Sequence, residues 1–172
     1  MRYILLFLLL PFSIQAQISL PKLVSDGAVL QRDQPLKIRG YASPEEKITI
    51  TFDKKKYRTK ADQNGNWTAT LPAFQAGGPY EMVLKGKNEI RIKDLLFGDV
   101  WLCTGQSNMV TPMERVKEKY PDEIANANYP EIRNFFIKTM TNLEGPQNDF
   151  PDGSWSIATP ENVMRFGAVS YF

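Results

Sequence analysis

Short runs of alternating polar and apolar residues, separated by turn-forming residues, dominate the first half of this chain. Residues 47–52 read Lys-Ile-Thr-Ile-Thr-Phe, which places every second side chain on one face, as in a strand buried on one side. Further short strands are predicted at residues 36–40, 57–60, 67–71, 80–84 and 90–95, with turns at 64–65, 77–79 and 86–88. Many short strands without a helical period predict a β-sandwich over residues 17–97.

The pattern changes near residue 98. Residues 99–104 form a continuous apolar run, typical of a parallel strand buried on both faces. Residues 113–126 are rich in helix formers, and residues 131–138 predict another strand. This β-α-β order favours the start of a doubly wound, flavodoxin-like α/β domain over residues 98–172. After a predicted loop at 139–159, Thr159-Pro160-Glu161 has the residues of a helix start.

The last predicted helix continues into Ala-Val-Ser-Tyr-Phe at 168–172, which contains neither a glycine cap nor a basic last turn. An α/β unit of this length is about half of a usual domain. We therefore expect the α/β domain to be incomplete within these 172 residues, with its C-terminal half missing. The alternative is a complete but unusually small second domain.

Residues 1–16 are interpreted as a signal peptide. Arg2 supplies the positive charge, an apolar stretch follows, and Ala16 offers a small residue at the cleavage position. The stretch is too short for a membrane span, which takes about 20 apolar residues. Cleavage after Ala16 would give a secreted or periplasmic mature chain without a membrane span; a buried N-terminal helix is the alternative.

Composition excludes several classes of function. The net charge of +2 gives no electrostatic case for a nucleic-acid partner, and the basic run at 54–56 is interpreted as a solvated hairpin tip. Cys103 is the only cysteine and is expected to be buried in a strand. Because the chain contains no histidine, neither a metal site nor a cysteine nucleophile is expected, and no cofactor is predicted.

The segment with the most chemical content runs from Gly98 to Met109 and reads Gly-Asp-Val-Trp-Leu-Cys-Thr-Gly-Gln-Ser-Asn-Met. A serine that follows a buried strand and a glycine can project from a sheet edge, with its backbone N–H facing a developing oxyanion. Ser107 could equally cap a following helix, and the residues alone leave both interpretations open. Asp99 is expected to be structural, because a carboxylate alone is a poor base for a serine hydroxyl.

This segment resembles the nucleophile block of sialate O-acetylesterases in the SGNH/GDSL hydrolase superfamily. The segments at 20–31, 61–71 and 76–80 are similar to the family's N-terminal β-rich domain. The resemblance implies an SGNH-hydrolase-like fold and a serine esterase without a cofactor. Ser107 would be the nucleophile and an oxyanion donor, and Gln106 and Asn108 would bind the substrate, an O-acetylated sialic acid or related sugar.

The family's reaction also needs an orienting acid and a histidine base, which the resemblance places in a later Asp-x-x-His block. The chain lacks histidine, so we expect it to be nearly inactive alone. Gly167 is not expected to be the oxyanion glycine. The alternative function is a secreted, non-catalytic β-sandwich that binds glycan or a partner domain. Tyr57, Trp67 and Tyr80 could stack on sugars, although a role in the core is favoured.

Overall fold

The computed structural model describes residues 17–138 and 140–172. The predicted signal peptide at 1–16 lies outside the described residues. Strands dominate the first part of the chain, as predicted: β1 (Val29–Gln31), β2 (Leu36–Tyr41), β3 (Lys47–Phe52), β4 (Lys55–Lys60), β5 (Asn66–Leu71), β6 (Gly77–Lys85) and β7 (Glu89–Gly98). All the strands expected between residues 36 and 95 are confirmed. The short β1 was missed, because three residues show no period.

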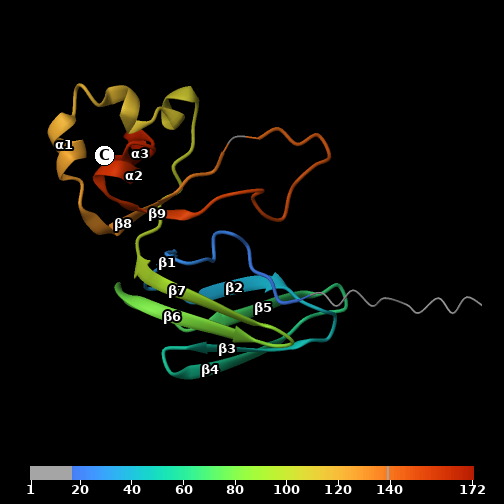
Figure 1. The fold of residues 1–172 in the computed structure, drawn as a ribbon. Coiled ribbons are helices and arrows are strands. Elements are labelled where there is room, and N and C mark those ends of the chain that lie inside the picture. The colour runs from blue at the N-terminus through green and yellow to red at the C-terminus, as the bar shows by residue number, and fades with distance from the viewer. Residues whose placement is uncertain (1–16, 139) are drawn as a thin grey trace, which may run out of the picture.

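These strands form two sheets. The larger has the order β1-β7-β6-β3-β4, and the smaller pairs β2 with β5. The pairing of β1 with β7 is parallel, whereas the other neighbouring strands run antiparallel. Inward-facing side chains from both sheets, such as Ile38, Ile50 and Leu84, belong to one buried cluster. The curled, mostly β lower part of the molecule in Figure 1 is built around this core.

Two of the three predicted turns are confirmed. Gly65 closes the β4–β5 turn with φ +82, and residues 86–88 connect β6 to β7. Residues 77–79 were predicted to be a turn, but they lie within β6. Gly78 comes so close to β7 that a Cβ there would lie 2.7 Å from the Leu95 carbonyl oxygen. The glycines therefore accommodate an irregularity between paired strands instead of reversing the chain.

The basic run at 54–56 lies at the β3–β4 hairpin, as expected. Asp53 and Lys54 form the turn with φ 45 and 60, and Lys55 begins β4. All three lysines are exposed.

The second part contains short elements around its own buried cluster. These are η1 (Ser107–Val110), η2 (Met113–Val116), α1 (Pro121–Asn126), β8 (Tyr129–Phe135), β9 (Trp155–Ala158), α2 (Pro160–Val163) and α3 (Ala168–Tyr171), where η denotes a 3₁₀ helix. Met113, Val163 and Phe166 belong to the buried cluster that holds them together. Among the described residues, no helix is long and apolar enough to cross a membrane.

Several predictions for this part are wrong. The helix expected at 113–126 is divided into η2 and α1, and Pro121 begins the second. The strand expected at 131–138 is β8, which pairs antiparallel with β9 rather than in a parallel β-α-β unit. The predicted loop at 139–159 contains β9. The predicted helix start is confirmed, because the Thr159 hydroxyl accepts a hydrogen bond from the Asn162 N–H at 3.2 Å.

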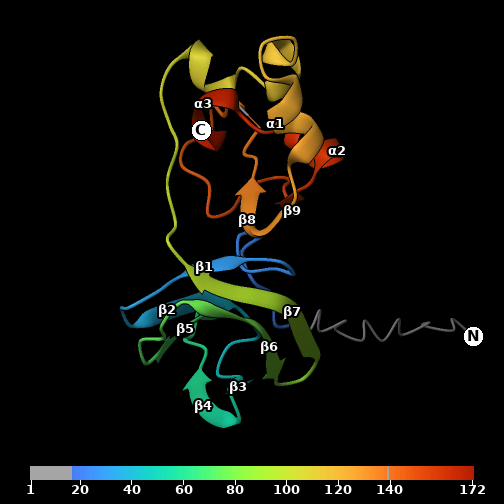
Figure 2. The ribbon, with the colours of Figure 1, turned by 90° about the vertical axis from the view of Figure 1, so that its left-hand side faces the viewer.

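One buried arginine joins the two parts. The Arg133 side chain on β8 is only 4% exposed. Its guanidinium donates to the Gly27 carbonyl at 2.7 Å and to the Asp94 carboxylate at 2.9 Å. Nearby, the Trp155 indole N–H donates to the Leu23 carbonyl at 3.0 Å. Figures 1 and 2 show β8 and β9 lying next to β1 at this junction.

Candidate functional site

Ser107 lies at the start of η1, in a turn on the surface. Its side chain is exposed and has no hydrogen-bond partner among the described residues. Gln106, not Ser107, is the N-cap of η1, and it makes no side-chain capping bond. The helix-cap interpretation of Ser107 is therefore wrong. Both Gln106 and Asn108 are also exposed, so the three residues at 106–108 are brought together on one surface turn.

The turn that presents Ser107 is tight. The Met109 N–H donates to the Gln106 carbonyl at 3.0 Å, which leaves Ser107 inside the closed loop. A Cβ at Gly105 would lie 2.8 Å from the Met109 Cγ, so the chain passes too close to this side chain for a larger residue. The backbone N–H of Ser107 begins the helical turn, where N–H groups have no acceptor within the helix. The hydroxyl and this N–H are thus both free to meet a ligand.

Two backbone hydrogen bonds join the residues just after η1 to the start of α3 and the residues before it. The Ala168 N–H donates to the Thr111 carbonyl at 2.8 Å, and the Met113 N–H donates to the Phe166 carbonyl at 2.9 Å. Gly167 is buried, and a Cβ there would lie 2.8 Å from the Met109 carbonyl oxygen. In the described structure, Gly167 is therefore a close-packing position behind the Ser107 turn.

The segment that leads to Ser107 contradicts its prediction. Residues 99–104 form no strand and run along one side of the molecule (Figure 2). Trp101 is 84% exposed and Leu102 is 81% exposed, and Cys103, which was expected to be buried, is also exposed. In the described part of the chain, no neighbouring strand pairs with this apolar run. Ser107 accordingly follows an extended, unpaired segment instead of a buried strand.

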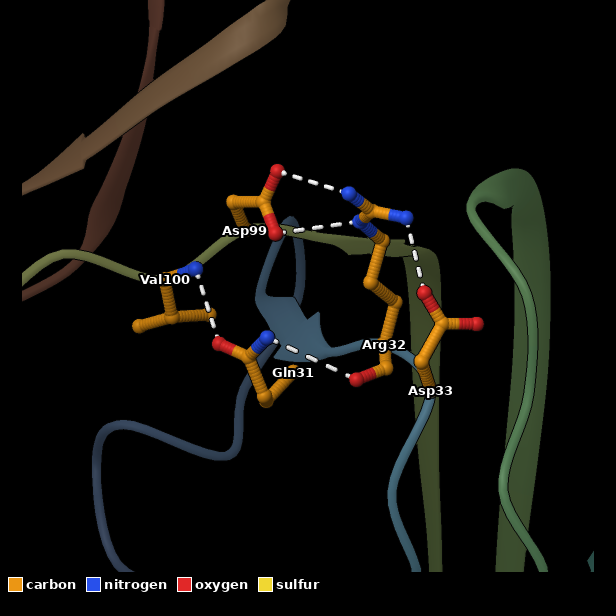
Figure 3. A network of polar contacts seen from close by, with 5 residues as sticks. All are labelled: Gln31, Arg32, Asp33, Asp99 and Val100. Atoms are coloured by element: carbon orange, nitrogen blue, oxygen red, sulfur yellow. Dashed lines mark hydrogen bonds and ion pairs between the residues drawn. The ribbon is translucent and has the colours of Figure 1, made fainter.

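A polar network fixes the first residue of this segment (Figure 3). The Arg32 guanidinium binds both Asp99 carboxylate oxygens, with Nε–Oδ1 at 3.0 Å and Nη2–Oδ2 at 3.2 Å. The hydrogen bond to Asp99, then the charge of Asp99, raises the pKa of Arg32. Gln31 accepts from the Val100 N–H at 3.0 Å. Asp99 is thus structural, as expected.

Sequence reasoning missed the partners Gln31 and Arg32. The polar run that follows β1 was the available signal, but Arg32 and Asp99 are separated by 67 positions. Only the parallel pairing of β1 with β7 brings them together.

Within residues 17–138 and 140–172, no side chain that could accept a proton forms a hydrogen bond with Ser107. The chain also contains no histidine. The helix α3, which packs against η1, has its own polar contact: the Tyr171 hydroxyl donates to Glu123 at 2.7 Å. Burial, followed by this hydrogen bond, raises the pKa of Tyr171. The phenol therefore stays neutral and is not a base near neutral pH.

The aromatic residues considered for sugar stacking belong to the β-rich core. Trp67 is 2% exposed, and its indole N–H donates to the Tyr41 carbonyl at 3.1 Å. Tyr57 and Tyr80 are half-buried and pack against the same cluster. The role in the core is therefore confirmed.

Several known esterases are similar to this chain in sequence. No protein-family profile matches the chain. Sialate O-acetylesterase from Mus musculus is 29% identical over 139 residues, and the protein of the same name from Homo sapiens is 28% identical over 156 residues. A carbohydrate acetylesterase from Xanthomonas citri is 42% identical, and its crystal structure superposes on 90% of this chain with a TM-score of 0.84.

This chain is related to the sialate O-acetylesterases. The aligned regions cover 73% of it in the comparison with Mus musculus and 81% in that with Homo sapiens. They cover only 26% and 29% of those relatives, and 35% of the Xanthomonas citri enzyme. The chain thus spans about a third or less of the length of these three esterases.

Proposed function

We propose that this chain is the N-terminal part of a serine esterase that removes O-acetyl groups from sialic acid or a related sugar. The observation that carries the proposal is the exposed, unpartnered Ser107 hydroxyl on the tight turn after Gly105, within a chain related to sialate O-acetylesterases. The similarity to a carbohydrate acetylesterase supports a sugar ester as the substrate class.

In the proposed reaction, Ser107 Oγ attacks the acetyl carbonyl carbon, and its proton passes to a base. The sugar oxygen leaves with a proton, and an acetyl-enzyme forms. Water then attacks this ester, which releases acetate and restores the hydroxyl. The backbone N–H of Ser107 would donate to the oxyanion in both tetrahedral intermediates. The exposed amide side chains of Gln106 and Asn108 would bind the sugar.

The base must come from outside these 172 residues, because the sequence contains no histidine. Removing the base histidine of a serine protease lowers turnover by about a millionfold, although binding and the oxyanion hole can still leave about a thousandfold acceleration over water. We therefore propose that the chain is nearly inactive alone, and that a later Asp-x-x-His block completes the triad.

The proposed layout is a signal peptide at 1–16, a β-sandwich at 17–97 and part of an SGNH-hydrolase-like α/β domain at 98–172. The separate cores of the two parts support a boundary near residue 98. The exposed apolar run at 99–104 supports a larger domain, because an exposed patch of this kind usually has a partner. Secretion or export to the periplasm is proposed from the leader sequence.

The test begins with the coding sequence downstream of Phe172, which should continue in frame to an Asp-x-x-His block. Acetate release from O-acetylated sialic acid is then measured for that longer protein, for its Ser107→Ala variant and for the 172-residue chain. Ser154→Ala is the matched control, because Ser154 is exposed and makes no hydrogen bond in the described structure.

We expect turnover only from the longer protein and its Ser154→Ala variant. Unchanged turnover after Ser107→Ala would eliminate the nucleophile assignment. Efficient turnover by the 172-residue chain would refute the claim that its base lies elsewhere.

A further inference from the structure

The outer face of the five-stranded sheet contains a shallow hollow on the side away from the core. It is about 470 Å³ in volume and is lined by residues of β3, β4, β6 and β7: Thr49, Thr51, Lys56, Arg58, Val83, Lys85 and Glu89. We call this the basic groove. It belongs to the β-rich part and does not include the Ser107 turn.

Strand register arranges cations around two hydroxyls in the basic groove. Thr49 pairs with Arg58 on β4 and with Lys85 on β6. Because neighbouring strands lie about 4.8 Å apart, Arg58 and Lys85 stand about 10 Å apart with Thr49 between them. In the next row on this face, Thr51 pairs with Lys56. The pairing therefore directs three cationic side chains to one face.

Lys56, Arg58 and Lys85 form no salt bridge in the described part of the chain. The acidic residue nearest to them in the strand register is Glu89, which pairs with Lys85 across β6 and β7. Glu89 is the only carboxylate in the lining, and its Oε1 already accepts from Arg91 at 3.3 Å. Three cations and one carboxylate give the lining a formal charge of +2. Adjacent like charges of this kind favour an anionic ligand.

We propose that the basic groove binds an acidic polysaccharide, with Lys56, Arg58 and Lys85 pairing its carboxylates and the threonine hydroxyls bonding its sugar hydroxyls. The lining contains no aromatic ring. That distinguishes it from single-strand nucleic-acid sites, in which bases stack on aromatic side chains. The groove is also smaller than the surface with which proteins contact the phosphates of a nucleic-acid duplex. The proposal goes beyond the esterase function and does not require it.

The test is binding of the 172-residue chain to polygalacturonate by titration calorimetry, with neutral dextran and duplex DNA as comparison ligands. The variant Arg58→Glu/Lys85→Glu reverses two charges in the groove. The control Lys37→Glu/Arg39→Glu makes the same change on β2, where both residues are exposed. Arg58→Gln/Lys85→Gln removes the same two charges without adding repulsion, and circular dichroism checks that every variant is folded.

We expect the chain and its β2 control to bind polygalacturonate with similar affinity, more weakly as salt rises, and not to bind dextran. The groove reversal should weaken binding by at least about tenfold, and the glutamine variant by less. Equal losses in both reversal variants, or no binding to polygalacturonate, would overturn the proposal. Tighter binding to DNA than to polygalacturonate would overturn the proposal that the ligand is an acidic polysaccharide.

The same titration on Ser107→Ala separates this proposal from the esterase. Its affinity for polygalacturonate should match that of the unmodified chain, whether or not Ser107 is a nucleophile. A loss of binding in Ser107→Ala would place the polysaccharide at the serine turn and refute the basic groove as its site.

Discussion

Replacing Arg133 with alanine is expected to lower the free energy of unfolding by about 2–3 kcal/mol. The side chain is 4% exposed and donates to the carbonyl oxygens of Gly27 and Asp94 and to the Asp94 carboxylate. Hydrogen bonds made by a charged group contribute about 1.5–3 kcal/mol each. The Asp94 side chain is 47% exposed, so its ion pair adds less than about 1 kcal/mol, and water can partly replace the donors at the carbonyls.

The measurement is urea unfolding at neutral pH, followed by tryptophan fluorescence and by far-ultraviolet circular dichroism. Trp155 reports on the junction, because its indole N–H donates to the Leu23 carbonyl. Arg39→Ala is the matched control, because Arg39 is exposed and has no ion pair among the described residues. This substitution should lower the free energy of unfolding by less than about 0.5 kcal/mol.

The loss of unfolding free energy in Arg133→Lys should lie between the losses in Arg133→Ala and Arg39→Ala. Lysine keeps the positive charge, but its ammonium lacks the planar fork in which Nη1 donates to the two carbonyls while Nη2 donates to the Asp94 carboxylate. Equal stability losses for Arg133→Ala and Arg39→Ala would refute the claim that Arg133 holds the two parts together.

Two further predictions follow from single contacts. The raised pKa of Tyr171 means that its neutral form stabilises the fold fully below the unfolded value of about 10 and that this contribution is lost as pH rises above it. Tyr171→Phe should therefore reduce the fall in the free energy of unfolding between pH 9 and pH 11 by the contribution of about one tyrosine. An unchanged pH dependence of this free energy would contradict the assignment. Gly65→Ala should lower the free energy of unfolding by about 1–3 kcal/mol, because φ is +82 and the new Cβ would lie 2.5 Å from the Ala42 carbonyl oxygen. An unchanged urea midpoint would contradict this prediction.

The β-rich part was predictable because its signal is local. In β3, alternate residues from Ile48 to Phe52 are buried, so the period of two in the sequence corresponds directly to one face of a sheet. Turn residues such as Gly65 then mark where each strand ends. The short β1 lacks both signals, and its identity as a strand depends on its partner β7.

The second part was less predictable because its signals depend on distant partners. Trp101 and Leu102 are apolar, which suggested burial, but hydropathy does not specify what would cover them. Likewise, the strand character of β8 was visible, whereas its antiparallel partner β9 lay in a predicted loop. For the candidate site, the glycine before Ser107 indicated a tight turn. The contact between Arg32 and Asp99 could not be found without the topology.

The parallel pairing of β1 with β7 has a consequence for the order of folding. Residues 29–31 find their hydrogen-bonding partners only at residues 96–98. On a growing nascent chain, β1 must therefore wait until β7 has emerged, while hairpins such as β3–β4 can already close. The Arg32–Asp99 pair directly follows the last paired residues of β1 and β7. Attachment of the segment leading to Ser107 through Asp99 therefore also depends on this late pairing.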